Sequence, residues 1–485
     1  MNLGKDWVLI SVEALMVLVM LASAIFHFYR TDTIPYGYHV DELSQAVTVE
    51  CIAKEGVDAH NNHYPLFFQT NYGSPRPPTS IYPAILWGDV QGFTVPSLRN
   101  YGVAVHLLGI VGIYFLGRLF FGHFFGLCAA FAASVSPWLW PTSRVAIESL
   151  FSPTFSIWAM YFFFRRQNYF HWSLAALLFC ASMYNYPAMR LQVPIMLVTL
   201  GIYAFRTMKT SFALWIVFIL SFVLPLIPLG MQILHGGAVH HRFSQISITS
   251  AEYLSRIGKT HSFKDLWDIF WGNYGLHLTP DFLLLRGDPS LVHSVGHFGI
   301  LSWLDLGALI FCALTLLWGI VKPKNLSNPW SKDSLFLVFL LANILLAIIP
   351  AALTNSELPH ALRIDGGWPF LCLLTGYFMY RWWHGWKPLF VIGFITGVLF
   401  LMAFVKAYFG PYQEQSKGMF SYWTKEQADA AKTEEDWNKF MLMYNNQDYH
   451  FRYFLMNYRS DTCTSTRLKW EKQRDLLISL NMYHQ

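Results

Sequence analysis

Residues 211–233, SFALWIVFILSFVLPLIPLGMQI, form a long apolar run without a single charged side chain. About 20 such residues in a helix cross the ~30 Å hydrocarbon core of a bilayer. Similar runs recur along the 485 residues, of which 54% are hydrophobic and only 13% are charged, whereas a soluble domain carries about 25% charged residues. The sequence therefore predicts an all-α polytopic membrane protein, and it excludes a disordered, fibrous or water-soluble chain.

Apolar runs of this kind predict about eleven transmembrane helices. The first run has no small-residue cleavage site after it, so we interpret it as a retained first span rather than a signal peptide. An odd number of spans places the two termini on opposite sides of the membrane. The predicted spans are 7–29, 98–119, 124–141, 147–164, 172–186, 190–206, 211–233, 298–320, 334–352, 366–382 and 388–408.

Short loops on one side carry most of the positive charge, which is typical of the cytoplasmic side. Their only acid is Asp333. The N-terminus is predicted on this side as well, and the larger loops 30–97, 234–297 and 353–365 on the opposite, exofacial side with the C-terminus. The basic residues of the cytoplasmic loops are Arg118, Arg165, Arg166, Arg206, Lys209, Lys322, Lys324, Lys332, Arg381 and Lys387.

Two units follow from this layout. Residues 1–408 form a transmembrane domain whose first outer loop is 30–97 and whose second large outer loop is 234–297. Residues 409–485 form a small exofacial helical domain that either caps the site and binds the acceptor or acts as a stabilising lid. Thr433 and Asp436 predict a helix start in it. Cys51 and Cys463 lie in polar segments, where a disulfide can form, and no cysteine spacing indicates a metal site.

The first outer loop opens with the adjacent acids Asp41 and Glu42, followed by apolar residues at three- and four-residue steps. This pattern predicts an amphipathic helix at the membrane surface. Asp41 is then either the N-cap of that helix or a reactive carboxylate. Arg76 lies in a proline-rich turn farther on, where it either binds a phosphate headgroup or snorkels to the interface.

Several motifs in the order found here resemble GT-C glycosyltransferases, in the branch that contains protein O-mannosyltransferases and aminoarabinose transferases. The resemblance covers most of residues 1–385, and the tail after 409 resembles no family. The motifs are HVDELS (39–44), SPRPPTSIYP (74–83), SLRNYGV (97–103), SRVAIES (143–149), SMYNYPAMRLQVP (182–194), DFLLLRGDPSLVHSVGHFG (281–299) and LPHALRIDGGWP (358–369).

The resemblance implies a GT-C-like bundle, a sugar donor linked to a polyprenyl phosphate, inverting transfer outside the cytoplasm, and Asp41 as general base. One position departs from the family pattern. Aminoarabinose transferases carry an acid before the basic residue of the Lys-Pro-Pro turn, and Pro75 stands there in this chain. A second acid or a metal-linked role at that turn is therefore not expected.

The chemistry of such a transfer selects candidate residues. The acceptor hydroxyl needs a base, and the departing lipid phosphate needs cations. We assign catalysis to Asp41 and Glu42. We assign the donor phosphate to Arg76, Arg99, Arg144, Arg286 and Arg363, and other substrate contacts to Tyr82, Glu148, Arg190, Asp288, His293 and His360.

Some of these residues also allow a structural interpretation. Arg144 and Glu148 are four residues apart and could form an ion pair. Asp288 is typical of a turn, and the histidines are typical of a membrane interface. We expect no metal and no cofactor, and the surplus of five positive charges is too small to indicate a nucleic-acid partner.

The expected function is the transfer of one sugar to an exofacial acceptor in a bacterial inner membrane. The acceptor would be a cell-envelope glycan such as O-antigen or another lipid-linked polymer. One alternative is a protein O-glycosyltransferase. Another is a lipid-linked-sugar flippase or other transporter, which would place ionisable groups at the membrane midplane. Glu13 and Asp305, however, fall near the ends of predicted spans.

Overall fold

The computed structural model describes residues 3–58, 61–68, 77–145, 147–235, 244–321 and 332–431, and the tail positions 433, 436, 453, 456, 462–466 and 469. Within these residues the chain is helical, and its only β-type pairings are two isolated bridges, Val57 with His63 and Ser247 with Thr354. This confirms the predicted all-α class.

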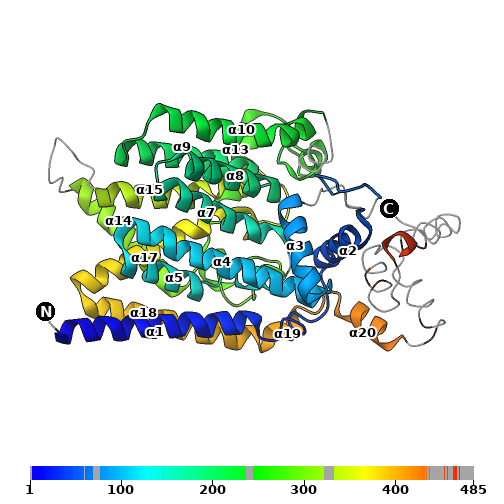
Figure 1. Cartoon of the computed structure of the whole chain (residues 1–485), viewed down its shortest axis with the longest axis horizontal. Helices are drawn as coiled ribbons and strands as arrows, with labels where there is room; N and C mark the ends of the chain where they lie inside the picture. The colour runs from blue at the N-terminus through cyan, green and yellow to red at the C-terminus, as the bar shows by residue number, and fades with distance from the viewer. Residues whose placement is uncertain are drawn as a thin grey trace.

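The helices run largely parallel in one elongated bundle (Figure 1). In chain order they are α1 (Leu3–Phe28), α2 (Val40–Glu55), α3 (Pro78–Gln91), α4 (Val95–Phe121), α5 (His123–Val135), α6 (Trp140–Ser143), η1 (Glu148–Leu150), α7 (Phe151–Arg165), α8 (Tyr169–Asn185), α9 (Met189–Thr207), α10 (Phe212–Leu234), α12 (Ala251–Arg256), α13 (Phe263–Leu276), the π-helical η2 (Asp281–Leu285), α14 (Trp303–Val321), α15 (Lys332–Leu346), α16 (Ile349–Ala352), η3 (Leu362–Gly367), α17 (Trp368–Gly385), α18 (Lys387–Tyr408), α19 (Pro411–Gln415) and α20 (Tyr422–Ala430).

A helix occupies each of the eleven predicted spans. Among the residues that the structure describes, five helical segments are long and apolar enough to cross a membrane by themselves: Trp7–Phe28, Val95–Phe121, Phe212–Leu234, Asp333–Ala352 and Lys387–Tyr408. The predicted span 334–352 is divided into α15 and α16, and Pro350 lies in the first turn of α16. Proline is favourable there because its missing N–H belongs to the first turn, where no intrahelical partner exists.

Helix α5 lies at the centre of the bundle, and all of its residues from Phe124 to Val135 are buried. Close packing of small residues makes this possible. A Cβ atom on Gly376 of α17 would lie 2.5 Å from the backbone of Ala129, and one on Gly126 would lie 2.6 Å from the carbonyl of Tyr114. Small residues let helix backbones approach closely inside a membrane, where van der Waals packing drives association.

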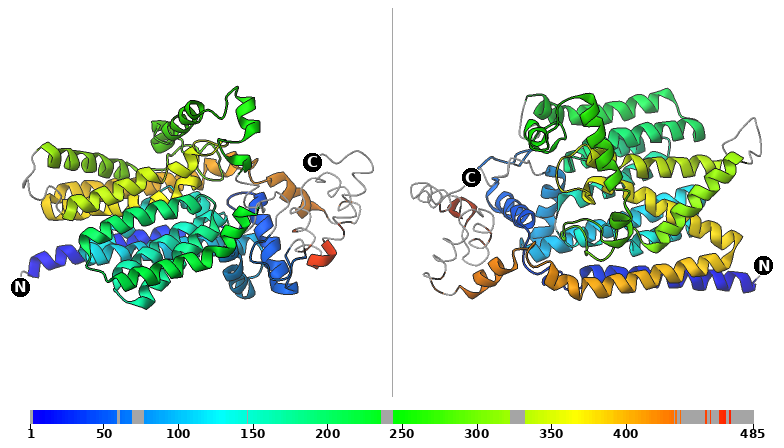
Figure 2. Two further views of the ribbon diagram at one scale, coloured as in Figure 1. Left: turned by 90° about the horizontal axis from the view of Figure 1, so that it is seen from above. Right: turned by 180° about the vertical axis from the view of Figure 1, so that it is seen from behind.

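The two ends of the bundle differ in what they carry. The start of α1 lies at one end, whereas α2, α3, α19 and α20 lie at the other (Figure 1). Figure 2 shows from two further sides that the first-loop helices and the start of the tail share this end. We call it the α2 end. The first outer loop and the beginning of the tail therefore meet at this end, where Tyr36 and Gln413, 377 residues apart, are hydrogen-bonded.

Two later loops are joined to each other at the α2 end. The amide of Asn273 in α13 donates to the carbonyls of Ala352 (3.1 Å) and Thr354 (2.9 Å). The amide of Asn355 donates to the carbonyls of Gln245 and Ser247, both at 2.9 Å. These bonds fix the predicted outer loop 234–297 against the loop 353–365.

The predicted helix start in the tail is confirmed. The backbone N–H of Thr433 donates to Asp436 Oδ2 (3.0 Å), and the N–H of Asp436 donates to Thr433 Oγ1 (3.1 Å). These reciprocal bonds satisfy N–H groups that have no partner inside the helix. The second predicted tail helix, over 467–480, lies outside the described residues except for position 469.

Candidate functional site

The start of α2 presents Asp41 on a rigid turn. His39 is the N-cap, and its ring accepts a hydrogen bond from the N–H of Asp41 (3.3 Å). The Glu42 carboxylate accepts the N–H of His39 (2.9 Å), which completes a capping box. The interpretation of Asp41 as the N-cap is therefore wrong. Its side chain is 39% exposed, and one carboxylate oxygen lies 3.5 Å from Nδ1 of His39.

Glu42 and Arg99 form a fully buried ion pair beneath Asp41. Nε and one terminal nitrogen of Arg99 donate to the two Glu42 oxygens at 2.7 and 2.9 Å. The guanidinium also donates to the carbonyls of Thr31, Pro35 and Gly37, at 3.2, 2.9 and 2.8 Å. We call this arrangement of Glu42, Arg99 and the turn 31–37 the base platform.

This geometry corrects the assignment of Arg99 to the donor phosphate. The Arg99 side chain is fully buried (0% exposed), and its nitrogens already donate five hydrogen bonds within the protein. Bidentate pairing with a carboxylate is among the strongest uses of an arginine. Arg99 therefore holds the loop to α2 and is enclosed away from any lipid headgroup, and Glu42 supports the position of His39 rather than facing a substrate.

Arg144 requires a similar correction. Its guanidinium donates to the carbonyls of Phe26, His27, Tyr29 and Ile34 and to the hydroxyl of Tyr408. Carbonyls at the C-terminus of a helix lack intrahelical partners, so Arg144 caps the end of α1. It is fully buried and is not open to a phosphate.

The polar face predicted for α2 is buried, contrary to the expectation of a surface helix. Ser44, Gln45 and Thr48 are each at most 1% exposed. The tail covers part of the helix, because Cys51 of α2 forms a disulfide with Cys463. The structure thereby confirms the pairing that the sequence left open. Disulfides of this kind form and persist in oxidising compartments.

A second polar group lies on the loops 286–302 and 353–365. Asp288, His293 and His360 each direct one polar atom to a common point, and these atoms lie within 4.8 Å of one another. Oδ2 of Asp288 lies 3.3 Å from Nδ1 of His293 and 3.6 Å from Nδ1 of His360. Asp288 also accepts the N–H groups of Ser290 (2.8 Å) and Ala361 (2.7 Å). We call these three side chains the Asp288 group.

Charges around the Asp288 group set its protonation. Burial raises the pKa of Asp288, but the imidazoles of His293 and His360 and the N–H of Ala361 outweigh burial, and the net pKa lies below the usual value. Burial and the nearby charge of Arg363 hold the pKa of His360 well below its usual value. At neutral pH the group therefore contains a carboxylate and a neutral imidazole at His360.

Asp288, His293 and His360 are also the described residues that could hold a metal ion. A carboxylate and two imidazoles are a suitable donor set for Zn²⁺. His293 Nδ1 is buried, lies 3.3 Å from Asp288 Oδ2 and accepts no backbone N–H within the described part of the chain. His360 Nδ1, in contrast, accepts the N–H of Leu362 (3.3 Å), and Asp288 already accepts two backbone N–H groups. The spacing of these residues along the chain does not indicate this grouping.

Arg363 is the cation beside the Asp288 group. One of its terminal nitrogens donates to Thr354 Oγ1 (2.7 Å) and to the Ser356 carbonyl (2.6 Å), and the other lies 3.8 Å from the Glu357 carboxylate. Its side chain is 10% exposed. Arg99 and Arg144 are enclosed by carbonyls, and Arg286 is held only by an exposed ion pair. Among the predicted phosphate ligands that the structure describes, Arg363 is therefore the one that is both held in place and partly open.

Two residues near this group were missed by the sequence analysis. Asp365 is fully buried, and neither carboxylate oxygen has a hydrogen-bond partner among the described residues. Burial raises its pKa well above the usual value. Tyr186 packs against buried apolar residues that include Val292 and Leu362, next to His293 and Arg363 in the sequence. The acid in LRIDGG was the only sequence signal for Asp365.

The remaining predicted residues lie at the edges of this region or outside it. Arg286 is 76% exposed and pairs with Asp281 (3.3 Å). The Tyr82 hydroxyl donates to the Pro65 carbonyl (3.0 Å), and Nε of Arg190 donates to the Met183 carbonyl (3.4 Å). These contacts are local. Arg76 lies outside the described residues.

One buried apolar cluster borders both the base platform and the Asp288 group. Its members are Val145, Ile147, Val292, Leu362 and Phe420, and Tyr186 packs against it. Phe420 also contacts the ring of His39, with 6.1 Å between ring centroids. The structure thus brings Asp41, Glu148, Asp288, His293, His360 and Arg363 to the same end of the bundle around one cluster, which we call the Phe420 cluster.

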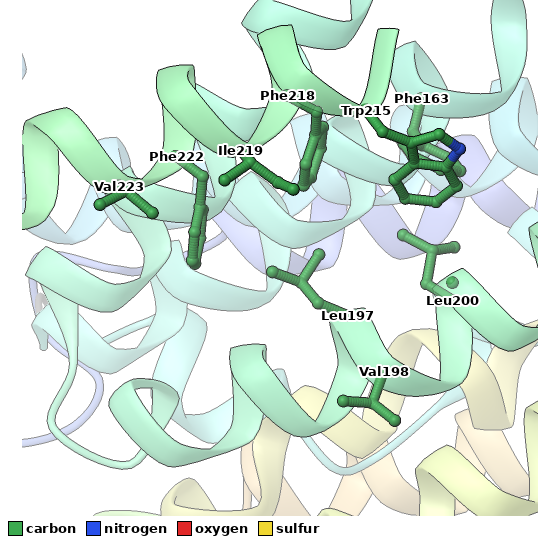
Figure 3. A pocket seen from close by; sticks show the side chains of 10 residues that line it. Phe163, Leu197, Val198, Leu200, Trp215, Phe218, Ile219, Phe222 and Val223 are labelled. Atoms are coloured by element: carbon green, nitrogen blue, oxygen red, sulfur yellow. The ribbon is translucent and has the colours of Figure 1, made fainter. Parts of the chain in front are cut away.

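A groove elsewhere in the bundle is apolar and of a different kind. It has a volume of about 360 Å³ and lies between α9 and α10, whose side chains face one another across it (Figure 3). It offers no charged or hydrogen-bonding side chain for chemistry except the indole of Trp215, and it suits hydrocarbon chains. Its lining residues are Phe163, Leu197, Val198, Leu200, Gly201, Trp215, Phe218, Ile219, Phe222 and Val223.

No protein-family model matches the chain, and no curated protein matches it. Solved structures similar to it include the oligosaccharyltransferase of Archaeoglobus fulgidus tethered to an acceptor peptide with an NVT sequon. The identity is 14%, the TM-score is 0.49, and the match covers 88% of this chain and 59% of that chain. This chain therefore spans about three fifths of the length of that protein.

Two further structures are similar. One is the oligosaccharyltransferase AglB of Archaeoglobus fulgidus with an inhibitory peptide and dolichol-phosphate, at 13% identity and a TM-score of 0.47, covering 91% of this chain and 60% of that chain. The other is ArnT of Cupriavidus metallidurans bound to undecaprenyl phosphate, at 12% identity and a TM-score of 0.47, covering 94% of this chain and 75% of that chain.

Proposed function

We propose that this protein is an inverting membrane glycosyltransferase that moves a single sugar from a polyprenyl-phosphate donor to an acceptor hydroxyl at the α2 end of the bundle. The observation that carries the proposal is the placement of Asp41. It is a partly exposed carboxylate, and the residues around it are fixed by a buried ion pair and a capping box. The motif resemblance independently assigns the base of a GT-C transferase to this position.

Asp41 is suited to the role of general base. As the acceptor oxygen bonds to C1 of the sugar, its proton passes to the Asp41 carboxylate. The bond between C1 and the phosphate oxygen breaks at the same time, and its electron pair leaves with the lipid phosphate. One displacement on the face opposite the leaving group inverts the anomeric centre. A positioned base of this kind contributes about 10²–10⁴-fold to the rate.

Arg363 and the histidines of the Asp288 group provide the other half of the reaction. The leaving lipid phosphate gains negative charge, which a fixed guanidinium stabilises through charge-assisted hydrogen bonds. Arg363 is held by Thr354 and by the Ser356 carbonyl, so little free energy is needed to orient its guanidinium when a phosphate binds. His293 contacts Asp288 through Nδ1 (3.3 Å), and its side chain is 12% exposed, so its ring can still contact the phosphate or a sugar hydroxyl.

The acceptor we favour is a cell-envelope glycan, such as O-antigen or another lipid-linked polymer, in the inner membrane of a bacterium. The decisive experiment supplies the purified protein with radiolabelled polyprenyl-phosphate hexoses and membranes that contain candidate acceptors. Label covalently bound in the glycan fraction supports the proposal, and label in the protein fraction indicates protein O-glycosylation. Donor that crosses the bilayer of sealed vesicles without covalent transfer indicates a flippase and contradicts the proposal.

The proposed orientation places the N-terminus in the cytoplasm and the α2 end outside. The basic residues of the short loops support it, and so does the disulfide, which requires an oxidising compartment. Reporter fusions after Lys209 should read cytoplasmic, and fusions near residue 265 and at the C-terminus should read exofacial. A cytoplasmic C-terminus would contradict the orientation and remove the tail from the reaction.

A further inference from the structure

Phe420, in the tail, lies where the loops that carry the candidate site residues meet. Its side chain is fully buried (0% exposed), although the residue before it, Met419, is 48% exposed. Phe420 belongs to the Phe420 cluster, whose other members come from two separate loops and from the turn after α6.

The other cluster members are sequence neighbours of candidate site residues. Ile147 directly precedes Glu148, and Val292 directly precedes His293. Leu362 lies between Ala361, whose N–H is bound by Asp288, and Arg363. The cluster therefore sets the backbone from which each of these polar side chains projects.

Phe420 also contacts His39 and Arg99, at the base platform. Its ring meets the ring of His39 edge-on, with 6.1 Å between centroids and 67° between planes. The guanidinium carbon of Arg99 lies 5.9 Å from the same ring centroid. His39 in turn accepts the N–H of Asp41 and lies 3.5 Å from its carboxylate. Phe420 is thus separated from the proposed base by one side chain.

The tail segment before Phe420 is anchored to both sides of the site. The Tyr412 hydroxyl donates to the carbonyl of Leu291 (2.7 Å), next to the Asp288 group. On the other side, the Tyr36 hydroxyl donates to the Gln413 side chain (2.8 Å). These two bonds hold α19 between the first outer loop and the loop 286–302.

The tail is attached again beyond Phe420. The Cys51–Cys463 disulfide joins it to α2 across a sequence separation of 412 residues. The carboxylate of Glu55, at the end of α2, accepts the backbone N–H (3.1 Å) and the hydroxyl (2.6 Å) of Thr464. The tail is therefore attached to the elements that bear the site both before Phe420, through α19, and after it, through Cys463 and Thr464.

We propose that Phe420 is a positioning residue of the transferase site, and that the tail which carries it is a working part of that site rather than a separate lid. The inference rests on the proposed function. Phe420 fixes the position of His39 relative to the loops that carry Glu148, His293 and Arg363. Its ring also excludes water from the space between the base platform and the Asp288 group.

The physical consequence concerns the partition between transfer and hydrolysis. A large-to-small change in a packed cluster leaves a cavity and lets its walls shift. Small displacements of a base or a phosphate ligand cost reaction rate even when binding survives. Water that enters beside a reactive C1 competes with the acceptor for the sugar. Loss of the ring should therefore lower transfer and raise the share of sugar released to water.

The test uses full-length protein in nanodiscs with a radiolabelled polyprenyl-phosphate hexose and acceptor. Sugar transferred and free sugar released are measured for wild type, Phe420→Ala and Phe420→Leu, with Met419→Ala as the matched control on the adjacent exposed residue. Disulfide formation, measured by thiol alkylation of the denatured protein, and the midpoint of thermal unfolding report whether the tail is still docked.

We expect Phe420→Ala to lower the transfer rate by about tenfold or more and to raise the ratio of released to transferred sugar, with Phe420→Leu in between and Met419→Ala like wild type. An unchanged ratio in both Phe420 variants would overturn the inference, even if total activity fell together with the folded fraction. Wild type that transfers no sugar would instead refute the proposed function. A docked, folded Phe420→Leu protein with a wild-type rate and ratio would overturn the positioning role.

Discussion

The base platform and the Asp288 group use the same kinds of side chain in opposite ways. On the platform, every nitrogen of the Arg99 guanidinium and both oxygens of Glu42 are bonded within the protein. Near the Asp288 group, both oxygens of Asp365 are buried without a hydrogen-bond partner in the described chain. Buried polar atoms are nearly always bonded, so each exception calls for an explanation.

The difference indicates that the two regions have different functions. The platform is complete without a ligand, which suits an element that holds one carboxylate at a fixed place. The other side retains hydrogen-bonding capacity on Asp365 that a sugar hydroxyl can satisfy. Site candidates that were chosen by their charge alone therefore divide into structural residues and residues open to a substrate. A candidate that is buried and has all its hydrogen bonds satisfied within the protein is a structural residue.

The largest expected effect comes from breaking the platform. Arg99→Ala leaves Glu42 buried without its partner and removes three bonds to the turn 31–37. Breaking a buried pair in this way costs about 3–5 kcal/mol. We expect a large drop in the midpoint of unfolding in detergent or nanodiscs.

Arg286→Ala is the matched control, because Arg286 is 76% exposed in its pair with Asp281. Exposed pairs of this kind contribute little to stability. Equal losses of stability in the two variants would mean that Arg99 is not the structural residue described above.

The second effect should appear in donor binding rather than stability. Arg363→Gln removes the charge beside the Asp288 group while keeping a side chain able to reach Thr354. A charge-assisted contact is worth roughly 1.5–3 kcal/mol, so affinity for a polyprenyl phosphate should fall by about 10- to 150-fold. Equilibrium binding of the lipid phosphate measures it, and unchanged affinity would move the phosphate site toward Arg76 or Arg286.

The smallest expected effect comes from removing metal ions. The Asp288 group is proposed to act through hydrogen bonds, so treatment with a strong chelator should leave the transfer rate within about twofold of that of the untreated enzyme. Metal analysis of the purified protein accompanies the assay. Activity that is lost on chelation and restored by Zn²⁺, but not in Asp288→Asn, would show that the group is a metal site.

Much of the fold could be predicted from the sequence because membrane helices leave a strong signal. Each span needs a long apolar run, and each such run is occupied by a helix. The break between α15 and α16 was missed because Pro350 is apolar and does not interrupt the hydropathy of its segment. The buried polar face of α2 was missed because the tail that covers it is distant in sequence.

The candidate site was only partly predictable, for a physical reason. Sequence gives the charge of Arg99 and Arg144, but whether a guanidinium meets carbonyls or solvent depends on how the loop 30–37 folds back on α1 and α2. Asp288, His293 and His360 were each named as contacts, yet their convergence depends on the hydrogen bonds between two loops. Phe420 carried no signal because an isolated aromatic residue is ordinary near a membrane.

The substitution Asp41→Asn tests the central claim most directly. It keeps the size of the side chain and leaves the His39–Glu42 capping box intact, because that box uses the backbone of residue 41 and not its carboxylate. An amide cannot take the acceptor's proton. We predict a normally inserted protein with an unchanged unfolding midpoint whose transfer rate is lower by about 10²-fold or more, whereas near-full activity would contradict the account and require the base to be sought among the carboxylates of the Asp288 side.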